Sequence, residues 1–474
     1  MEDTARLPEA CKFGRVDSVS PVIRTLPSPV RQRQPQRPLA KAVKADPVPA
    51  PFETFSSLSI HKPHNESTRL MLAVADALSR FNMSEGFFML VPSRIGHSRN
   101  VDSAATAVLD AIRHDARRCN GNRSVQAATS HSYIKAVSGL RTALTRSNRD
   151  EIACDHAVLA AALLASFDRI HYTAGVPCDA HVQGISALLL ARNPEKPPSE
   201  LARQLLYWHW VGTFQIPVAR GEPSPFETAA WLNAESVTKK CAGPDARTLS
   251  RIGNMLYIRL PRLIALVRSL RNDPADTALR RQTVDTARQL LALKDVAAEN
   301  NILHLVKLNK TVDEADAHII PFSFDFDIPG VFTAAAKYWQ TTVILNILCL
   351  TIARNIASFK GIAEPAAFRS ENRRLATNIM MCWTYAFALG VSGVWSLYLA
   401  LLAAWAVTED ISGEFSRGLD VGLRYNDLHR GKASLTSEQM DEAADLLAGG
   451  PLRGFFVEVC DVSASLVRTS EQMS

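Results

Sequence analysis

DHAVLAAALLASFDRI (155–170) and HVQGISALLL (181–190) are the stretches that decide the fold. They lie within the segment from Val137 to Arg192, in which an alanine-rich buried helix is predicted first and a second helix follows after a short polar break. The apolar residues recur at three- and four-residue spacing, as on one face of a helix. The same spacing extends over most of the chain, so we predict an all-α, multi-helix domain.

Further helices are expected on both sides of this segment. Apolar faces predict helices over residues 67–81, 102–119 and 130–147. Asp273, followed by Pro274 and Asp276, is typical of a helix start, and we expect that helix to run towards residue 300. Thr436 and Gln439 match a capping box for a last helix that would end at residues 449–451. No strand series and no internal repeat is expected.

Length and composition favour a globular protein of a reducing compartment. A chain of 474 residues with 47% apolar content can bury at least one large core. Its eight cysteines are far apart, unlike those of a disulfide framework, and charged residues stand where a signal peptide would need an apolar run. The net charge of +6 permits contact with nucleic acid without arguing for it.

Residues 1–62 differ from the rest of the chain. Prolines recur through this segment, so we expect a disordered, proline-rich basic arm before a helical domain over 63–474, with a possible sub-boundary near 245. The positive charges of its densest part are candidates for nuclear import or phosphate contact: Arg31, Arg33, Arg37, Lys41 and Lys44. A solvated basic linker is the alternative interpretation.

The apolar run over 379–407 contains no charged residue and is long enough to cross a bilayer. Its centre, Gly390-Val-Ser-Gly393, favours a break between two buried helices instead. A membrane-associated helical protein is the alternative interpretation of this run.

The order of residues over 133–189 resembles the helical middle-homology domain of fungal-specific transcription factors. The residues that carry the resemblance are Tyr133, Leu140, Leu144, 155–164, and His181-x-x-Gly184-x-x-x-Leu188-Leu189. Later in the chain, Trp339, Asn346 and Arg354 are similar to that family's helix of Trp, Asn and Arg. Trp395-Ser-Leu397-Tyr398-Leu-Ala400 is similar to its Trp-x-Leu-Tyr-x-Ala segment, although the family usually has proline where Ser396 stands.

The resemblance implies a nuclear transcriptional regulator and no enzyme. Such a protein would control a metabolic or biosynthetic gene set through other regulators or a second copy of itself, with a small-molecule effector as a further partner and no membrane contact. Classical members read DNA through a zinc cluster of six cysteines, whereas only Cys11 lies in the corresponding region here. We therefore expect no metal and no cofactor, and direct DNA contact stays open.

Four aromatic residues are the candidate effector pocket, chosen for their capacity to anchor a ligand: Tyr207, Trp208, Trp210 and Trp339. Core packing is the alternative interpretation of the two tryptophans around His209.

Two further site classes are weaker. Five possible metal ligands fall in a short span: Cys154, His156, His171, Cys178 and His181. A zinc site would need at least three of these side chains to converge, whereas packing in the core needs no such convergence. An all-α isoprenoid-type enzyme would need acidic magnesium motifs, for which residues 313–316 and 426–427 are incomplete candidates. No catalytic residue is predicted.

Overall fold

The computed structural model describes residues 65–80, 86–117, 123–146, 154–171, 179–192, 199–209, 211–232, 243–311, 317, 320–356, 359, 364–389, 391–407 and 437–451. All of them belong to the unit that spans residues 61–474. The basic arm with its five candidate contact residues lies outside the described residues, as do Cys11, Cys178 and the incomplete acidic motifs. Statements about these positions therefore stay predictions.

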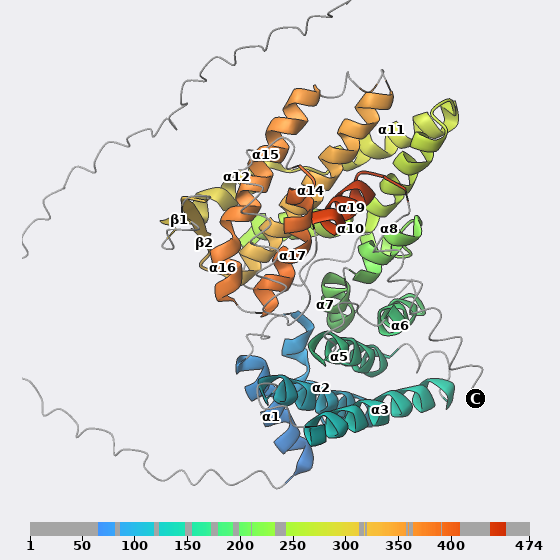
Figure 1. The fold of residues 1–474 in the computed structure, drawn as a ribbon. Helices are drawn as coiled ribbons and strands as arrows, with labels where there is room; N and C mark the ends of the chain where they lie inside the picture. The colour runs from blue at the N-terminus through green and yellow to red at the C-terminus, as the bar shows by residue number, and fades with distance from the viewer. Residues whose placement is uncertain are drawn as a thin grey trace, which may run out of the picture. The chain divides into compact units, whose positions relative to one another are not determined.

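The amino-terminal half of this unit consists of helices and short turns (Figure 1). In chain order they are α1 (Glu66–Arg80), η1 (Gly86–Leu90), η2 (Pro92–Arg94), α2 (Arg99–Arg117), α3 (Arg123–Arg146), α5 (Asp155–His171), α6 (Asp179–Leu190), α7 (Glu200–Trp208), η4 (Val211–Gln215), α8 (Ile216–Arg220) and α9 (Ala229–Leu232). Of these, η4 is a π-helix that continues directly into α8.

The carboxyl-terminal half is also helical and contains one small sheet. Its elements are α10 (Gly243–Asn272), α11 (Thr277–Leu291), α12 (Val296–Leu305), β1 (Lys307–Lys310), β2 (Phe322–Asp325), α14 (Pro329–Asn355), α15 (Pro365–Met381), α16 (Trp383–Ala388), α17 (Val391–Trp405) and α19 (Ser437–Leu447). The all-α prediction is confirmed.

The first core forms around α5, the predicted alanine-rich helix. Every residue from Ala157 to Asp168 is buried, and α5 packs against α2, α3 and α6. Alanine side chains are short, so neighbouring helices can approach α5 closely on several sides. This explains why the alanine-rich stretch is buried all round instead of along one stripe.

The second core forms around α14, which lies among α10, α15 and α17 (Figure 1). Pro329 occupies the first turn of α14, where a missing backbone N–H costs nothing. From Ala334 to Leu350 every residue is buried. Among the described residues, the first core is formed by residues up to 232, together with Ile258. The second core is formed by residues from Phe214 onward, so the two cores overlap in sequence between residues 214 and 258.

The structure contains one antiparallel pair, in which Leu308 faces Phe324, and no strand series among the described residues. Two local predictions about helix ends need correction. The helix expected to start at Asp273 starts later, because Asp276 is the residue whose carboxylate accepts from the N–H groups of Ala278 and Leu279. That helix ends at Leu291, because Asp295 caps a new one, α12.

The apolar run over 379–407 is divided twice, into the end of α15, the short α16, and α17. The predicted break near residue 390 is confirmed, and a second break at Cys382 was not foreseen. In the part of the chain that the structure describes, no helix combines the length and the apolar character that crossing a bilayer requires.

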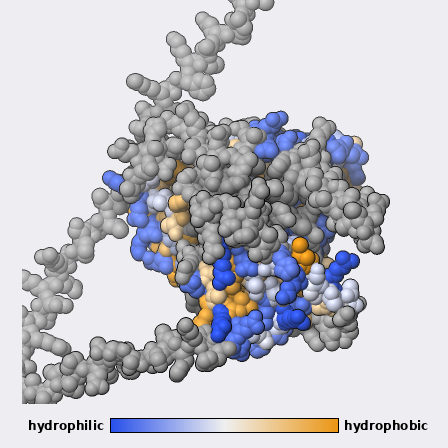
Figure 2. Space-filling view, turned by 60° about the horizontal axis from the view of Figure 1, so that its bottom comes forward, coloured by the Kyte–Doolittle hydropathy of each residue, from blue (hydrophilic) through white to orange (hydrophobic). Residues whose placement is uncertain are grey.

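Large apolar side chains are also exposed on the amino-terminal half. Among the described residues of this half, the most exposed are Leu72 of α1, Met89 of η1 and Ile134 of α3, each more than half exposed. Figure 2, which turns the lower face of Figure 1 forward, shows hydrophobic side chains among the hydrophilic ones of this face.

The end of α19 is fixed against α10 by a left-handed glycine. Gly449 has φ +80°, and a Cβ at this position would lie 2.7 Å from Cγ1 of Val267. The chain can therefore turn here only without a side chain, and Arg268 of α10 then donates through Nε to the Gly450 carbonyl at 2.7 Å.

We predict that Gly449→Ala lowers the free energy of unfolding by roughly 2–4 kcal/mol, because strain at positive φ adds to the clash with Val267. Gly243→Ala is the matched control, since Gly243 has φ +72° but no atom within 4 Å of the added Cβ. This control substitution should lower the free energy of unfolding, measured with urea, by only about 1 kcal/mol. Equal losses in the two variants would contradict the close contact.

Candidate functional site

The buried helix α14 carries polar side chains whose partners lie on α12 and α15. Trp339 is fully buried and donates its indole N–H to Oε1 of Glu299 at 2.8 Å. Arg374 of α15 donates to the same carboxylate through both terminal nitrogens, at 2.7 and 3.0 Å. A buried carboxylate needs such donors because an unpaired charge in a core costs several kcal/mol. This cluster ties three helices together.

A second polar cluster lies two turns further along α14. The side-chain amide of Asn346 donates to Glu371 at 2.9 Å and to Asn372 at 3.0 Å, and its oxygen accepts from Lys294 at 2.8 Å. Lys294 also pairs with Glu371 at 2.7 Å. The donors and acceptors of Asn346 are thus used, as a fully buried amide requires.

Lys337 is the most unusual titratable group of α14. It is buried against α10, where Nζ donates to Oδ1 of Asn254 at 2.9 Å and lies 5.0 Å from the ring centre of Tyr257. Burial lowers the pKa of Lys337 well below its ordinary value. A lysine so placed is a candidate base or nucleophile in general, but the pocket described below does not include it.

In the first core, three helices meet where the half-buried side chains of Tyr133 and His181 surround the buried carboxyl group of Asp168. The Tyr133 hydroxyl of α3 is hydrogen-bonded to Nε2 of His181 of α6 at 2.7 Å, and Oδ2 of Asp168 of α5 lies 3.6 Å from the same nitrogen. The Asp168 side chain is 1% exposed, and no described group forms a hydrogen bond of ordinary geometry with either of its oxygens.

Burial shifts the pKa values of Asp168 and His181 in opposite directions. Burial raises the pKa of Asp168 to about 7, and the Tyr133 hydroxyl offsets part of that shift. Burial lowers the pKa of His181 to about 4. Near pH 6 both side chains are therefore neutral, which avoids a charge in the core.

A serine and a histidine meet beside the π-helix. Oγ of Ser186 lies 2.8 Å from Nε2 of His209 and 3.2 Å from the Val182 carbonyl, and the tautomer of His209 decides which of these two groups accepts the serine proton. Gly212 leaves the space for this ring, since a Cβ there would lie 2.0 Å from Nε2.

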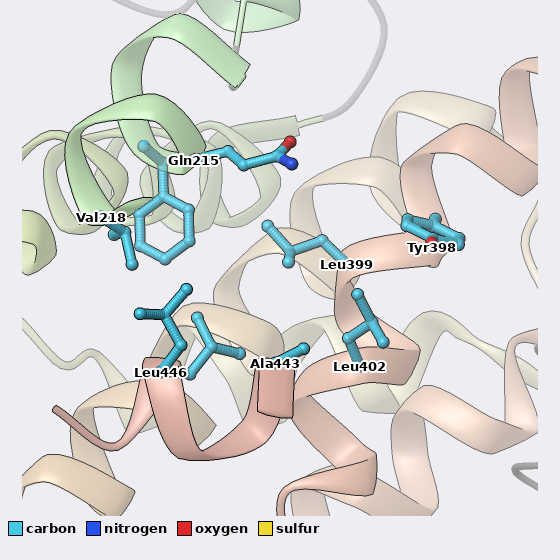
Figure 3. A pocket seen from close by; sticks show the side chains of 9 residues that line it. Gln215, Val218, Tyr398, Leu399, Leu402, Ala443 and Leu446 are labelled. Carbon is cyan, nitrogen blue, oxygen red and sulfur yellow. The ribbon is translucent and has the colours of Figure 1, made fainter. Parts of the chain in front are cut away.

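An apolar pocket lies at the carboxyl end of the same π-helix. Its lining residues come from η4, α8, α17 and α19: Phe214, Gln215, Val218, Tyr398, Leu399, Leu402, Ala443, Leu446 and Leu447. The empty space is about 420 Å³ with the solvent at its mouth included. Figure 3 shows Val218, Leu446 and Leu399 around it, with the amide of Gln215 above Leu399. No charged residue lines it.

Of the four predicted pocket residues, the two whose side chains the structure describes, Trp208 and Trp339, do not line this pocket. Trp339 belongs to the Glu299 cluster, and Trp208 packs its ring against Phe87 and Phe88 at centroid distances of 4.8 and 5.8 Å. Trp208 thus has core contacts, which favours the packing interpretation. The side chains of Tyr207 and Trp210 lie outside the described residues, so their role stays a prediction.

The candidate metal ligands are dispersed among described and undescribed positions. His181 is engaged by Tyr133, and the ring of His156 stacks on His97 with centroids 6.5 Å apart. Among the described residues, no three His, Cys, Asp or Glu side chains are grouped so that they could hold a metal ion.

In comparisons with known proteins, the chain matches no family model, no curated protein and no solved structure. The interpretation of the site therefore rests on its own geometry and on the sequence pattern.

Sequence reasoning missed the pocket and the paired charges, although a signal for some of them was present. Asp168 is a lone acid in an alanine-rich run and Lys337 a lone base in the run AAAKYW, and an isolated charge in a buried helix usually has a specific environment. The pocket residues are ordinary core types, so no local pattern distinguishes them.

We predict that Trp339→Phe lowers the free energy of unfolding by about 1–3 kcal/mol beyond the loss of ring size, because Glu299 loses a donor. Trp231→Phe is the control, since Trp231 is also buried and makes no indole hydrogen bond to any described residue. Both variants would be compared by denaturant unfolding. A larger loss for Trp231→Phe would mean that the indole–carboxylate bond contributes little.

The carboxyl group of Asp168 predicts a specific pH dependence. Its folded pKa of about 7 lies above the ordinary 3.8, so the stability it provides is present at low pH and is lost as pH rises to 7. His181 acts in the opposite sense, since its folded pKa of about 4 lies below 6.5, and its contribution is lost as pH falls.

Asp168→Asn should therefore gain stability relative to the unmodified chain as pH rises from 4.5 to 8, by on the order of 2–4 kcal/mol. Urea unfolding at several pH values measures this difference. The same substitution at solvent-exposed Asp76 should leave the pH profile nearly unchanged. Parallel profiles for Asp168→Asn and the unmodified chain would refute a protonated Asp168.

Proposed function

We propose that this protein is a transcriptional regulator of the fungal-specific type, whose helical unit acts through protein partners and a small effector. The proposal rests first on residues that the sequence separates and the fold joins. The Tyr133 hydroxyl and the His181 imidazole, both part of the resembling pattern, form a hydrogen bond between α3 and α6. The leucines of that pattern pack in the same core: Leu140, Leu144, Leu159, Leu163, Leu164, Leu188 and Leu189.

The second support comes from the carboxyl-terminal half. Trp339, Asn346 and Arg354 lie on one helix, α14, and two of them hold the polar clusters that join α14 to its neighbours. Leu397 and Ala400 of the similar apolar segment lie fully buried on α17, which packs against α14. A pattern whose members share contacts is more informative than one whose members are scattered.

The chemistry of the described residues gives less support to an enzyme. The buried base Lys337 and the buried acid Asp168 belong to different cores. General acid–base chemistry needs both groups within reach of one substrate.

Chromatin occupancy of the tagged protein, expressed from its own locus with its transcript start mapped, tests the proposal. Discrete peaks at promoters are the expected result, and the mapped start identifies whether an upstream cysteine cluster or a partner supplies the DNA reading. A uniform, peak-free signal from a protein that is expressed and folded would refute promoter control.

The basic arm makes a separate prediction about location. Replacing Arg31, Arg33 and Arg37 by glutamine should abolish nuclear accumulation, because import signals are recognised through clustered positive charge. Glutamine at Arg6, Arg15 and Arg24 removes the same charge from the less dense part of the arm and should leave accumulation intact. Nuclear retention of the first variant, measured by imaging, would remove the import role.

A further inference from the structure

The pocket between α8, α17 and α19 has a lining that selects one class of ligand. Seven of its nine residues are hydrocarbon side chains, and the remaining two, Gln215 and Tyr398, carry one uncharged polar group each. A charged ligand would lose its hydration there without gaining a counter-ion. An apolar ligand with a single hydrogen-bonding group matches the lining.

Two polar contacts hold α19, which forms one wall of the pocket. Polar contacts fix α19 on both sides of its apolar centre: Asp441 accepts from the Trp405 indole at 2.8 Å, and Asp445 pairs with Arg271 at 3.3 Å. Between and beyond these contacts, Ala443, Leu446 and Leu447 face the empty space. A ligand in the pocket would thus contact the apolar face of α19 between and beyond its polar contacts.

The opposite wall belongs to the π-helix and α8. Phe214 and Gln215 are the last residues of η4, and π-helical turns occur frequently at functional sites. The same turn holds His209 against Ser186 of α6, in the neighbourhood of the first core. An occupant of the pocket therefore touches the segment that connects the two cores.

We propose that this pocket binds a small, uncharged, mainly apolar molecule with one hydrogen-bonding group, and that its binding holds α19 onto the body of the domain. Within the proposed function this molecule is the effector, and the docking of α19 is the state it controls. The binding step itself does not depend on whether the protein acts at promoters, and its test uses purified full chain alone.

Phenol, benzene and benzoate are suitable probes, because they share one ring and differ in the polar group. Phenol should bind with a dissociation constant of about 1 mM or lower, benzene about tenfold more weakly, and benzoate not measurably. Saturating phenol should slow backbone hydrogen exchange over 437–447 at least severalfold and leave α2 unchanged. Equal binding of benzoate, or exchange in α19 that phenol does not alter, would overturn the proposal.

Variants separate the pocket from non-specific binding. Ala443→Phe fills the space and should abolish phenol binding, whereas Ala297→Phe adds the same ring to an exposed position of α12 and should not. Gln215→Leu keeps the shape and should bring the affinity for phenol down to that for benzene. Should Ala443→Phe fail to fold, the Gln215→Leu comparison decides alone, and an unchanged phenol preference there refutes the assignment. Loss of promoter peaks with intact phenol binding would instead refute only the regulator function.

Discussion

The carboxyl-terminal half of the fold depends on the hydrogen bonds that the carboxylate of Glu299 accepts from Trp339 and Arg374. This carboxylate is almost completely buried, yet it satisfies the indole of Trp339 and the guanidinium of Arg374 together, so one side chain of α12 fixes the positions of α14 and α15. A helix as buried as α14 could slide or rotate if its contacts were only apolar, since leucine and isoleucine pack in many registers. Directional hydrogen bonds at Trp339 and Asn346 set its register, and α10, α15 and α17 then pack around it. Removing Arg374 would leave the buried carboxylate of Glu299 without its counter-ion.

The predictable part of the fold was the part that local spacing encodes. The alanine-rich α5, the helices α1 to α3 and the break near residue 390 follow from apolar periodicity and from glycine. The bounds of α1 and α2 agree with the expected ones within three residues, whereas α3 begins at Arg123, well before the expected start at residue 130. The choice between Asp273 and Asp276 as cap failed because both are good acceptors, and only tertiary packing determines how far α10 continues. The strand pair was missed because it is four residues long on each side and its partners are separated by an unpredictable connection.

The candidate site shows the same division between local and long-range information. Trp339 and Asn346 stood out in the sequence by their resemblance, and the structure explains them as hydrogen-bonding residues of a buried helix. The pocket combines residues that lie about two hundred positions apart, from 214 to 447, and none of these differs in type from an ordinary core residue. Only the packing of η4 and α8 beside α17 and α19 makes them a site. Phe214 at the end of the π-helix η4 packs in the second core, and His209 just before η4 contacts Ser186 of α6. An occupant of the pocket would therefore touch a segment that also contacts α6.

Native-state hydrogen exchange of the full chain, resolved by peptide, tests most directly the claim that α14 is the central support of the fold. The account predicts that amides over 334–350 are among the slowest to exchange in the protein, and that α12 and α15 exchange in the same cooperative unit, while α19 opens earlier. Exchange over 334–350 as fast as that over 437–447, or opening of α14 before α15, would contradict the dependence of the fold on the Glu299 contacts.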